Sequence, residues 1–330
     1  MSTAAALHFT QRPWWPWAKR TAAILFLAGV AALVLRQART IDWSEVLDAI
    51  RDLPLRTVLA AGALALCSHA LYSCYDLLGR HLTGHRLGTG TVMGVTFISY
   101  GFNLNLGSMV GGIAFRFRLY SRLGLKADDI TRIVGVSLLT NWTGYLLVAG
   151  VAFLLWPPAL PPDWKLDSGG LRIVGAIALA MALGYVLFCA WAHERRWVVR
   201  GHRIEPPGVR MALLQLLMSG INWSLIAGVI WVLLQGRVDY PHVLTVLLMS
   251  VMATLIVRVP GGVGVLETVF VALLAYRVPQ GQLLAALLAY RGLYYLLPLM
   301  LATLGYGITE FRARRLRLAS SGVARRKCHV

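Results

Sequence analysis

Charged residues are scarce in this chain, and acidic residues are the scarcest. Of its 330 residues only 14% are charged, with 14 Asp and Glu against 32 Lys and Arg. Hydrophobic residues make up 58%, and the mean hydropathy is +0.65. So few charges cannot cover the surface of a soluble protein of this size. The sequence therefore predicts an integral membrane protein over residues 1–330, with connections too short for a separate soluble domain.

Cysteine is also rare, and its four positions have no spacing typical of a metal site. The glycine-rich stretch "GGVGVLE" is no nucleotide-binding loop, because no strand precedes it and no lysine follows it. No nucleophile stands beside a suitable base. We therefore expect no metal, no cofactor and no enzymatic activity.

The net charge of +18 raises the possibility of a nucleic-acid partner. However, the basic residues cluster in particular loops and near both ends of the chain, as they do in cytoplasmic loops of membrane proteins. We expect membrane lipid rather than nucleic acid as the neighbour of these charges. Counting them from loop to loop places both termini in the cytoplasm, with 308–330 as a basic tail.

Long apolar runs predict an all-α, polytopic membrane protein. About 18 mostly apolar residues are needed to cross the hydrocarbon layer as a helix, and no alternation typical of a membrane barrel is present. Six full spans are expected at about 21–36, 55–78, 130–156, 171–192, 211–234 and 283–307.

Two further apolar segments are interrupted and predict re-entrant or broken hairpins, which gives seven or eight segments in all. Residues 90–113 contain Gly111 and Gly112 and lead into the basic stretch "RFRLYSRLGLK". Residues 243–276 break around Pro260, Gly261 and Gly262 into arms of about 14 to 16 residues, which are short for crossing. Broken backbone at membrane depth is tolerated where protein or a cavity surrounds it. Counting charges does not decide whether 243–276 crosses fully.

The layout of span, span, hairpin and span occurs twice, starting from opposite sides, which predicts an inverted repeat of 21–156 and 171–307. At an offset of 150 residues, Gly111 and Gly112 coincide with Gly261 and Gly262, and Asn141 coincides with Arg291. The matches are few and chance remains the alternative. The same offset extends the first hairpin toward residue 126. In transporters with inverted repeats, the binding site lies near the midplane between the broken elements.

Two ionisable residues lie deep in the second half. Glu267 follows the glycine break, Arg291 lies about nine residues into the last span, and helix rise puts both near mid-membrane. Such residues face a bundle interior or a wet cavity, because hydrocarbon disfavours their charge. One interpretation is a salt bridge that fixes the hairpin. The other is a binding site, in which Arg291 holds a phosphate or carboxylate and Glu267 is its counter-charge or a proton carrier.

Other candidates are less specific. Arg116 and Arg118 are either ordinary cytoplasmic charges or a headgroup-collecting site at the cytoplasmic mouth. Asn141 is either a helix-packing residue or a contact for substrate. His69 and Tyr72, in the second span, are expected to pack and to form interhelical hydrogen bonds.

The stretches "VPGGVGVLE", "LLAYRGLYY" and "FNLNLGSMVGGIAFRFRLYSRLGL" resemble the lysylphosphatidylglycerol synthase transmembrane-region family over nearly the whole chain. The resemblance implies a lipid-flippase-like membrane region in a bacterial inner membrane. It assigns hairpin and site roles to Pro260, Gly262, Gly264 and Glu267, and a downstream basic role to Arg291. It implies no synthase activity, because the soluble aminoacyl transfer domain of the multidomain members is missing from this sequence.

We expect a protein that binds anionic phospholipid or moves it between leaflets. Two alternatives remain at this point: a proton-coupled carrier of a small anionic solute, and a non-transporting membrane partner of envelope lipid enzymes. The carrier predicts a sealed cavity, whereas a lipid transporter needs a lateral opening between helices. The sequence does not decide whether lipid-synthesis enzymes or a second copy of the chain are partners.

Overall fold

A computed structural model describes residues 43–161, 164, 167–192, 197–199, 202–204, 207–257 and 262–310. The predicted first span at 21–36, the bend residues Pro260 and Gly261, and the tail from residue 311 lie outside these ranges.

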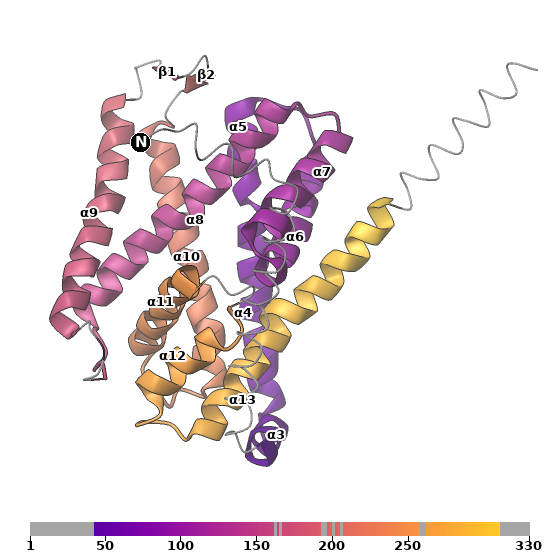
Figure 1. Ribbon diagram of the computed structural model, residues 1–330. Helices are drawn as coiled ribbons and strands as arrows, with labels where there is room; N and C mark the ends of the chain where they lie inside the picture. The colour runs from indigo at the N-terminus through magenta and orange to yellow at the C-terminus, as the bar shows by residue number, and fades with distance from the viewer. Residues whose placement is uncertain are drawn as a thin grey trace, which may run out of the picture.

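Helices dominate the described part of the chain (Figure 1). Six of them are long and apolar enough to cross a membrane, so the all-α polytopic class is confirmed. Five contain predicted spans, and α11 is the sixth. They are Leu55–Thr83 (α4 and α5), Ala127–Leu155 (α8), Ser168–Ala192 (α9), Val209–Leu233 (α10), Tyr240–Val257 (α11) and Gln280–Glu310 (α13 and its continuation).

The first interrupted segment reverses its direction at Gly107, whose φ of 83° suits glycine best. Helix α6 (Thr89–Leu106) leads into the turn, and a π-helix η1 (Ser108–Ala114) followed by α7 (Phe115–Arg122) leads out of it. The two arms pack tightly, since a Cβ at Gly111 would lie 2.3 Å from the backbone of Phe102. The returning arm therefore continues past residue 113 to Arg122 and contains Arg116 and Arg118. Its re-entry into a membrane stays a prediction.

The second interrupted segment consists of α11 and the shorter α12 (Val265–Leu274), which pack against each other. Gly262 has a φ of 59°, and a Cβ there would lie 3.0 Å from the Thr254 hydroxyl. At 18 residues, α11 is about 27 Å long by helix rise and exceeds the expected arm. The predicted arm was too short because the helix already begins at Tyr240.

The core is centred on α10, which packs on both α4 and α8, and it includes side chains of α11, α12 and α13; α8 also runs along α9. At one end of the molecule lie the α7–α8 turn and two short antiparallel strands, β1 (Trp197–Val199) and β2 (His202–Ile204), between α9 and α10 (Figure 1). At the other end lie α3 (Trp43–Arg51), which packs on α13 (Gln280–Tyr290), and the α12–α13 turn.

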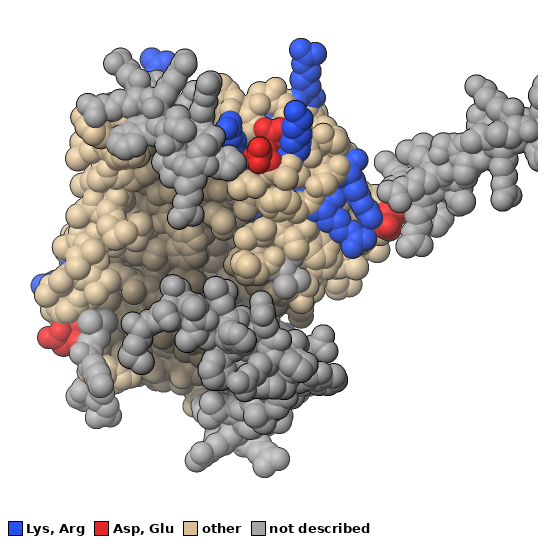
Figure 2. Space-filling view, turned by 45° about the horizontal axis from the view of Figure 1, so that its top comes forward, with Lys and Arg blue, Asp and Glu red and all other residues tan. Residues whose placement is uncertain are grey.

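The two ends of the molecule differ in the charge of their side chains. Figure 2 shows most Lys and Arg side chains at the end where α5 (Tyr75–Thr83), α7 and α8 meet, while the surface between the ends is largely uncharged. Arg80, Arg86, Arg122 and Lys126 belong to this basic end. The opposite end mixes signs, with Asp48, Asp52, Arg237 and Asp239.

Candidate functional site

The two ionisable residues singled out in the second half form an ion pair. Glu267 lies in the first turn of α12, and Arg291 begins the π-helix η3 (Arg291–Leu296) that follows α13. The guanidinium binds the carboxylate through two nitrogens: Nε donates to Glu267 Oε1, and a terminal nitrogen donates to Oε2 at 3.1 Å. This two-point geometry is the one by which arginine binds carboxylates and phosphates. We call this pair the hairpin-2 pair.

The break between α11 and α12 contributes backbone groups to the same pair. The N–H of Gly264 donates to Glu267 Oε2 at 2.9 Å, and Arg291 donates to the carbonyl of Gly262 at 2.9 Å. Gly264 has a φ of 81°, so the helix starts from a left-handed residue that glycine adopts without strain. Glu267 thereby caps α12, whose N-terminus favours negative charge. The Glu267 carboxylate therefore lies at the N-terminus of α12, between the Gly264 N–H and the Arg291 guanidinium.

Water and ligands have partial access to the hairpin-2 pair. The side chains of Arg291 and Glu267 are 14% and 16% exposed, and the guanidinium also lies 5.4 Å from the ring centre of Tyr295. Large apolar side chains near the pair along the chain are exposed as well. They are Ile256 and Val257 at the end of α11, Val263 in the break, Leu296 at the end of η3, and Leu297 directly after it. Both partners of the pair are therefore close in sequence to exposed apolar side chains.

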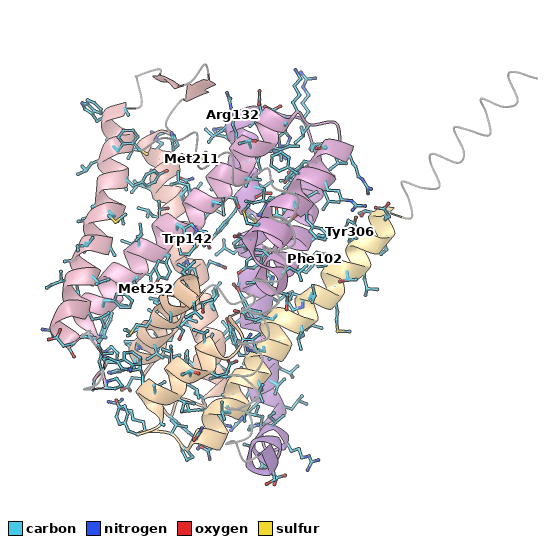
Figure 3. All side chains as sticks on the ribbon, in the orientation of Figure 1. Phe102, Arg132, Trp142, Met211, Met252 and Tyr306 are labelled. Atoms are coloured by element: carbon cyan, nitrogen blue, oxygen red, sulfur yellow. The ribbon has the colours of Figure 1, made fainter. Side chains whose placement is uncertain are left out.

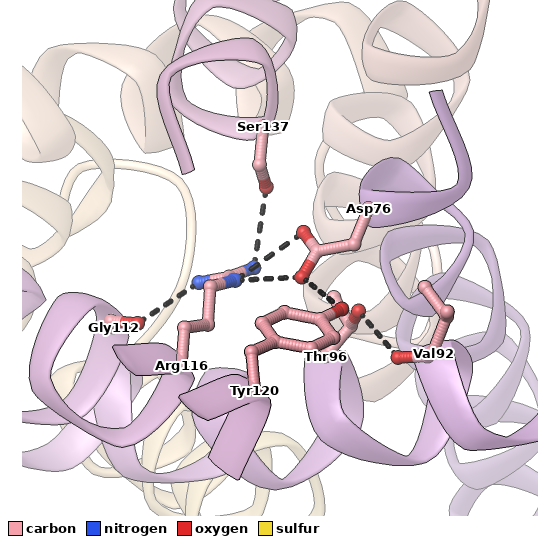
Figure 4. A network of polar contacts seen from close by, with 7 residues as sticks. All are labelled: Asp76, Val92, Thr96, Gly112, Arg116, Tyr120 and Ser137. Atoms are coloured by element: carbon pink, nitrogen blue, oxygen red, sulfur yellow. Dashed lines mark hydrogen bonds and ion pairs between the residues drawn. The ribbon is translucent and has the colours of Figure 1, made fainter. Parts of the chain in front are cut away.

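A second ion pair belongs to the first hairpin and is shielded from solvent (Figure 4). Arg116 of α7 donates from Nε to both carboxylate oxygens of Asp76, at 2.9 and 3.2 Å, and the two side chains are 3% and 0% exposed. Its terminal nitrogens donate to the Gly112 carbonyl and the Ser137 hydroxyl, both at 3.2 Å. The Tyr120 hydroxyl donates to Asp76 at 2.9 Å. We call this the hairpin-1 pair.

This placement differs from the one expected for Arg116. A guanidinium that donates to Asp76, Ser137 and Gly112 inside the bundle does not collect headgroups at a cytoplasmic mouth. Because residues two apart on a helix point in different directions, Arg118 faces outward instead and is 54% exposed.

Arg118 and Arg122 both pair with Glu310 at the end of the last long helix. The guanidinium of Arg118 also lies 5.5 Å from the ring centre of Tyr306. Figure 3 shows Tyr306 and Phe102 near each other between this helix and α6, with ring centres 6.3 Å apart. The returning arm of the first hairpin is thus fastened to the end of the last helix at the basic end of the molecule.

Comparison with known proteins places the chain in a family. The family model described as "Lysylphosphatidylglycerol synthase TM region" matches residues 21–302. The chain belongs to this family.

Two known proteins are similar to this chain over almost their whole lengths. It is 45% identical over 306 residues to Inner membrane protein YbhN of Escherichia coli (strain K12), covering 92% of this chain and 96% of that protein. It is 30% identical over 314 residues to an uncharacterized protein of Synechocystis, covering 91% and 94%. Neither name states an enzymatic activity.

The remaining predicted site residues lie apart or outside the described ranges. The backbone carbonyl of Asn141 accepts hydrogen bonds from Ser219 at 3.0 Å and from Trp223 at 3.3 Å, so this residue helps α8 pack on α10. Gly111 and Gly112 lie in the first hairpin, whereas Gly262 and Gly264 lie against the hairpin-2 pair. Pro260 and Gly261 are not among the described residues.

Sequence reasoning missed Asp76, although the signal was present. It is an acidic residue near the end of an apolar span, and the argument that identified Glu267 applies to it equally. Among the described residues, no three His, Cys, Asp or Glu side chains gather as metal ligands.

Proposed function

We propose that this protein binds anionic phospholipid through Arg291 and moves it between the leaflets of a bacterial inner membrane. The observation that carries the proposal is the hairpin-2 pair. It combines a two-point arginine, a carboxylate that occupies its two donors, and exposed apolar residues close in sequence to both. A phosphate headgroup suits the arginine, and acyl chains suit the apolar surface.

In this mechanism the lipid phosphate displaces Glu267 from Arg291. Guanidinium groups bind carboxylate and phosphate by the same two-point contact, so one anion can replace the other. When Glu267 returns to Arg291, it competes with the phosphate and promotes release. The acyl chains remain in the hydrocarbon throughout, beside Val257, Val263 and Leu296.

The basic end of the molecule is placed in the cytoplasm in this proposal, following the usual excess of Lys and Arg in cytoplasmic loops. Exposed Arg118 would then meet anionic headgroups first, since surface cations attract anionic lipid. The inner-membrane location rests on the printed name of the Escherichia coli relative.

Exposed apolar surface beside the pair favours a lipid over a small solute, because a solute carrier needs a site sealed from the hydrocarbon. A solute carrier driven by protons would instead show uptake of a small anion that depends on an imposed pH gradient, with no lipid movement.

Liposomes test the proposal. The purified protein is reconstituted with a fluorescent anionic phospholipid in both leaflets, and an impermeant quencher is added outside. We expect fluorescence to fall below the half that a static bilayer retains, and Arg291→Ala to retain about half. The matched control is Arg277→Ala, which removes a partly exposed arginine at the far end of α12. A plateau at half for the unmodified protein, with and without a pH gradient, would contradict lipid translocation.

A further inference from the structure

The turn that carries Arg291 lacks one of its own backbone hydrogen-bond donors. At the α-helical distance of four residues the carbonyl of Tyr294 meets Pro298, which has no N–H, so this carbonyl has no α-helical donor. A buried carbonyl left without a donor is unfavourable, so most are paired. Here the donor comes from another helix: Nε2 of His69, on α4 (Leu55–Ser73), lies 3.1 Å from the Tyr294 oxygen.

This contact fixes the chemical state of His69. A carbonyl oxygen only accepts, so Nε2 must carry the hydrogen. The side chain is buried, and its ring packs 4.7 Å from the ring of Tyr294. The next carbonyl, that of Tyr295, accepts from the side-chain amide of Asn105 on α6, at 3.3 Å. Two helices of the first half thus supply donors to the Arg291 turn.

The side-chain hydroxyl of Tyr294 is also hydrogen-bonded to other helices. Ser68 donates its single hydroxyl hydrogen to the side-chain amide oxygen (Oδ1) of Asn222 at 2.7 Å. Tyr294, 2.8 Å from Ser68, must therefore donate to it, and Tyr100, 3.0 Å from Tyr294, must donate to Tyr294. This chain runs from α6 through η3 and α4 to α10, and all four residues are buried.

We propose that His69 is a positioning residue for Arg291: by donating to the Tyr294 carbonyl, whose α-helical donor is absent at Pro298, it sets the π-turn that aims the guanidinium at the break after α11. The consequence for ligand binding rests on the function proposed above, whereas the positioning itself does not.

The test reads the position of the turn directly. Gly292 follows Arg291, and a Cβ there meets nothing within 4 Å, so Gly292→Cys is a tolerated reporter. In a chain whose four native cysteines are replaced, the rate of its modification by a charged, water-soluble thiol reagent is measured. We expect His69→Leu to change this rate at least threefold. The matched control is Ser73→Ala, a buried residue of the same helix that bonds only to its own helix backbone, and it should leave the rate unchanged.

A suppressor separates positioning from packing. Pro298→Ala restores an N–H that can donate to the Tyr294 carbonyl within the helix. The double variant His69→Leu, Pro298→Ala should therefore return the modification rate toward that of Pro298→Ala alone, and it should fold even if His69→Leu by itself does not. His69→Gln, which retains a donor, should have a smaller effect than His69→Leu.

An unchanged rate in His69→Leu would overturn the inference. So would an effect of His69→Leu that is equally large whether Pro298 is retained or replaced by alanine. Lipid movement is followed separately in liposomes. If the unmodified protein moves no lipid, the proposed function fails, while the modification rates still decide whether His69 positions the turn.

Discussion

Each hairpin contributes one partner of an ion pair from the arm that follows its break, Arg116 in the first and Glu267 in the second, and the two pairs differ in their surroundings. The hairpin-1 pair of Arg116 and Asp76 is almost completely buried, with Ser137, Tyr120 and a carbonyl as further partners. The hairpin-2 pair of Arg291 and Glu267 is partly exposed, and exposed apolar residues lie close to both partners in the sequence. A charge with no access to a ligand can only hold structure, whereas an accessible pair can exchange partners.

The comparison predicts the largest stability loss at the hairpin-1 pair. Asp76→Asn leaves Arg116 charged and buried without its counter-ion, which should destabilise the protein by about 3–5 kcal/mol. Thermal unfolding in detergent measures this loss. The double variant Asp76→Leu, Arg116→Met removes both charges and should be more stable than Asp76→Asn. If Asp76→Asn has the same melting temperature as the unmodified protein, the hairpin-1 pair has no structural role.

Replacing a glycine should likewise cost more stability in the first hairpin than in the second. Gly111→Ala puts a Cβ 2.3 Å from the Phe102 backbone, which should force the arms apart at a cost of about 1–3 kcal/mol or more. Gly264→Ala only strains a left-handed residue, at about 1–2 kcal/mol. Melting temperatures of the two variants rank them, with Gly90→Ala as a control because a Cβ there meets nothing within 4 Å. An equal loss for both would undo the ranking.

The hairpin-2 pair should show a smaller effect on stability and a large one on activity. Glu267→Gln weakens the pair and the cap of α12, for which about 1 kcal/mol is typical of caps. Lipid movement in liposomes should nevertheless fall at least tenfold, because release requires a charged competitor for Arg291. Loss of stability in proportion to loss of activity would point to a purely structural pair.

The smallest effect is expected at the exposed cluster of the basic end. Glu310→Gln removes the partner of Arg118 and Arg122, and exposed pairs contribute about 0–1 kcal/mol. The melting temperature should hardly move. Binding to anionic vesicles should strengthen and remain sensitive to salt, since one negative charge is lost. Vesicle co-sedimentation at low and high salt checks this.

Much of the hairpin-2 pair was predictable from the sequence, because the same rule applied to both partners: a charged residue deep in an apolar segment faces a bundle interior or a wet cavity. Glu267 and Arg291 satisfied that rule at matching depths, and they do pair. Five of the predicted spans, between residues 55 and 307, were predictable from apolar length, whereas α11 was expected only as a short arm of a hairpin. The first interrupted segment turns at Gly107, and its returning arm continues past residue 113 to Arg122.

What sequence reasoning could not supply is which way side chains point. Arg116 and Arg118 were treated alike, but two residues along a helix separate them by about 200° at 3.6 residues per turn, so one is buried and the other exposed. The π-turn at Arg291 depends on a donor from α4, which lies far earlier in the chain. No local sequence pattern predicts this contact, because it forms only when α4 and η3 pack against each other.

The measurement that most directly tests the central claim, that Glu267 stands where a ligand's anion binds, is equilibrium binding of an anionic phospholipid to the purified protein. Affinities are compared for the unmodified protein, Glu267→Gln and Arg291→Ala, with Asp239→Asn as a matched acid at the far end. The account predicts that Glu267→Gln binds more tightly, because its competitor is gone, and that Arg291→Ala loses binding. Equal weakening in both variants would contradict it, since Glu267 would then support the ligand rather than compete with it.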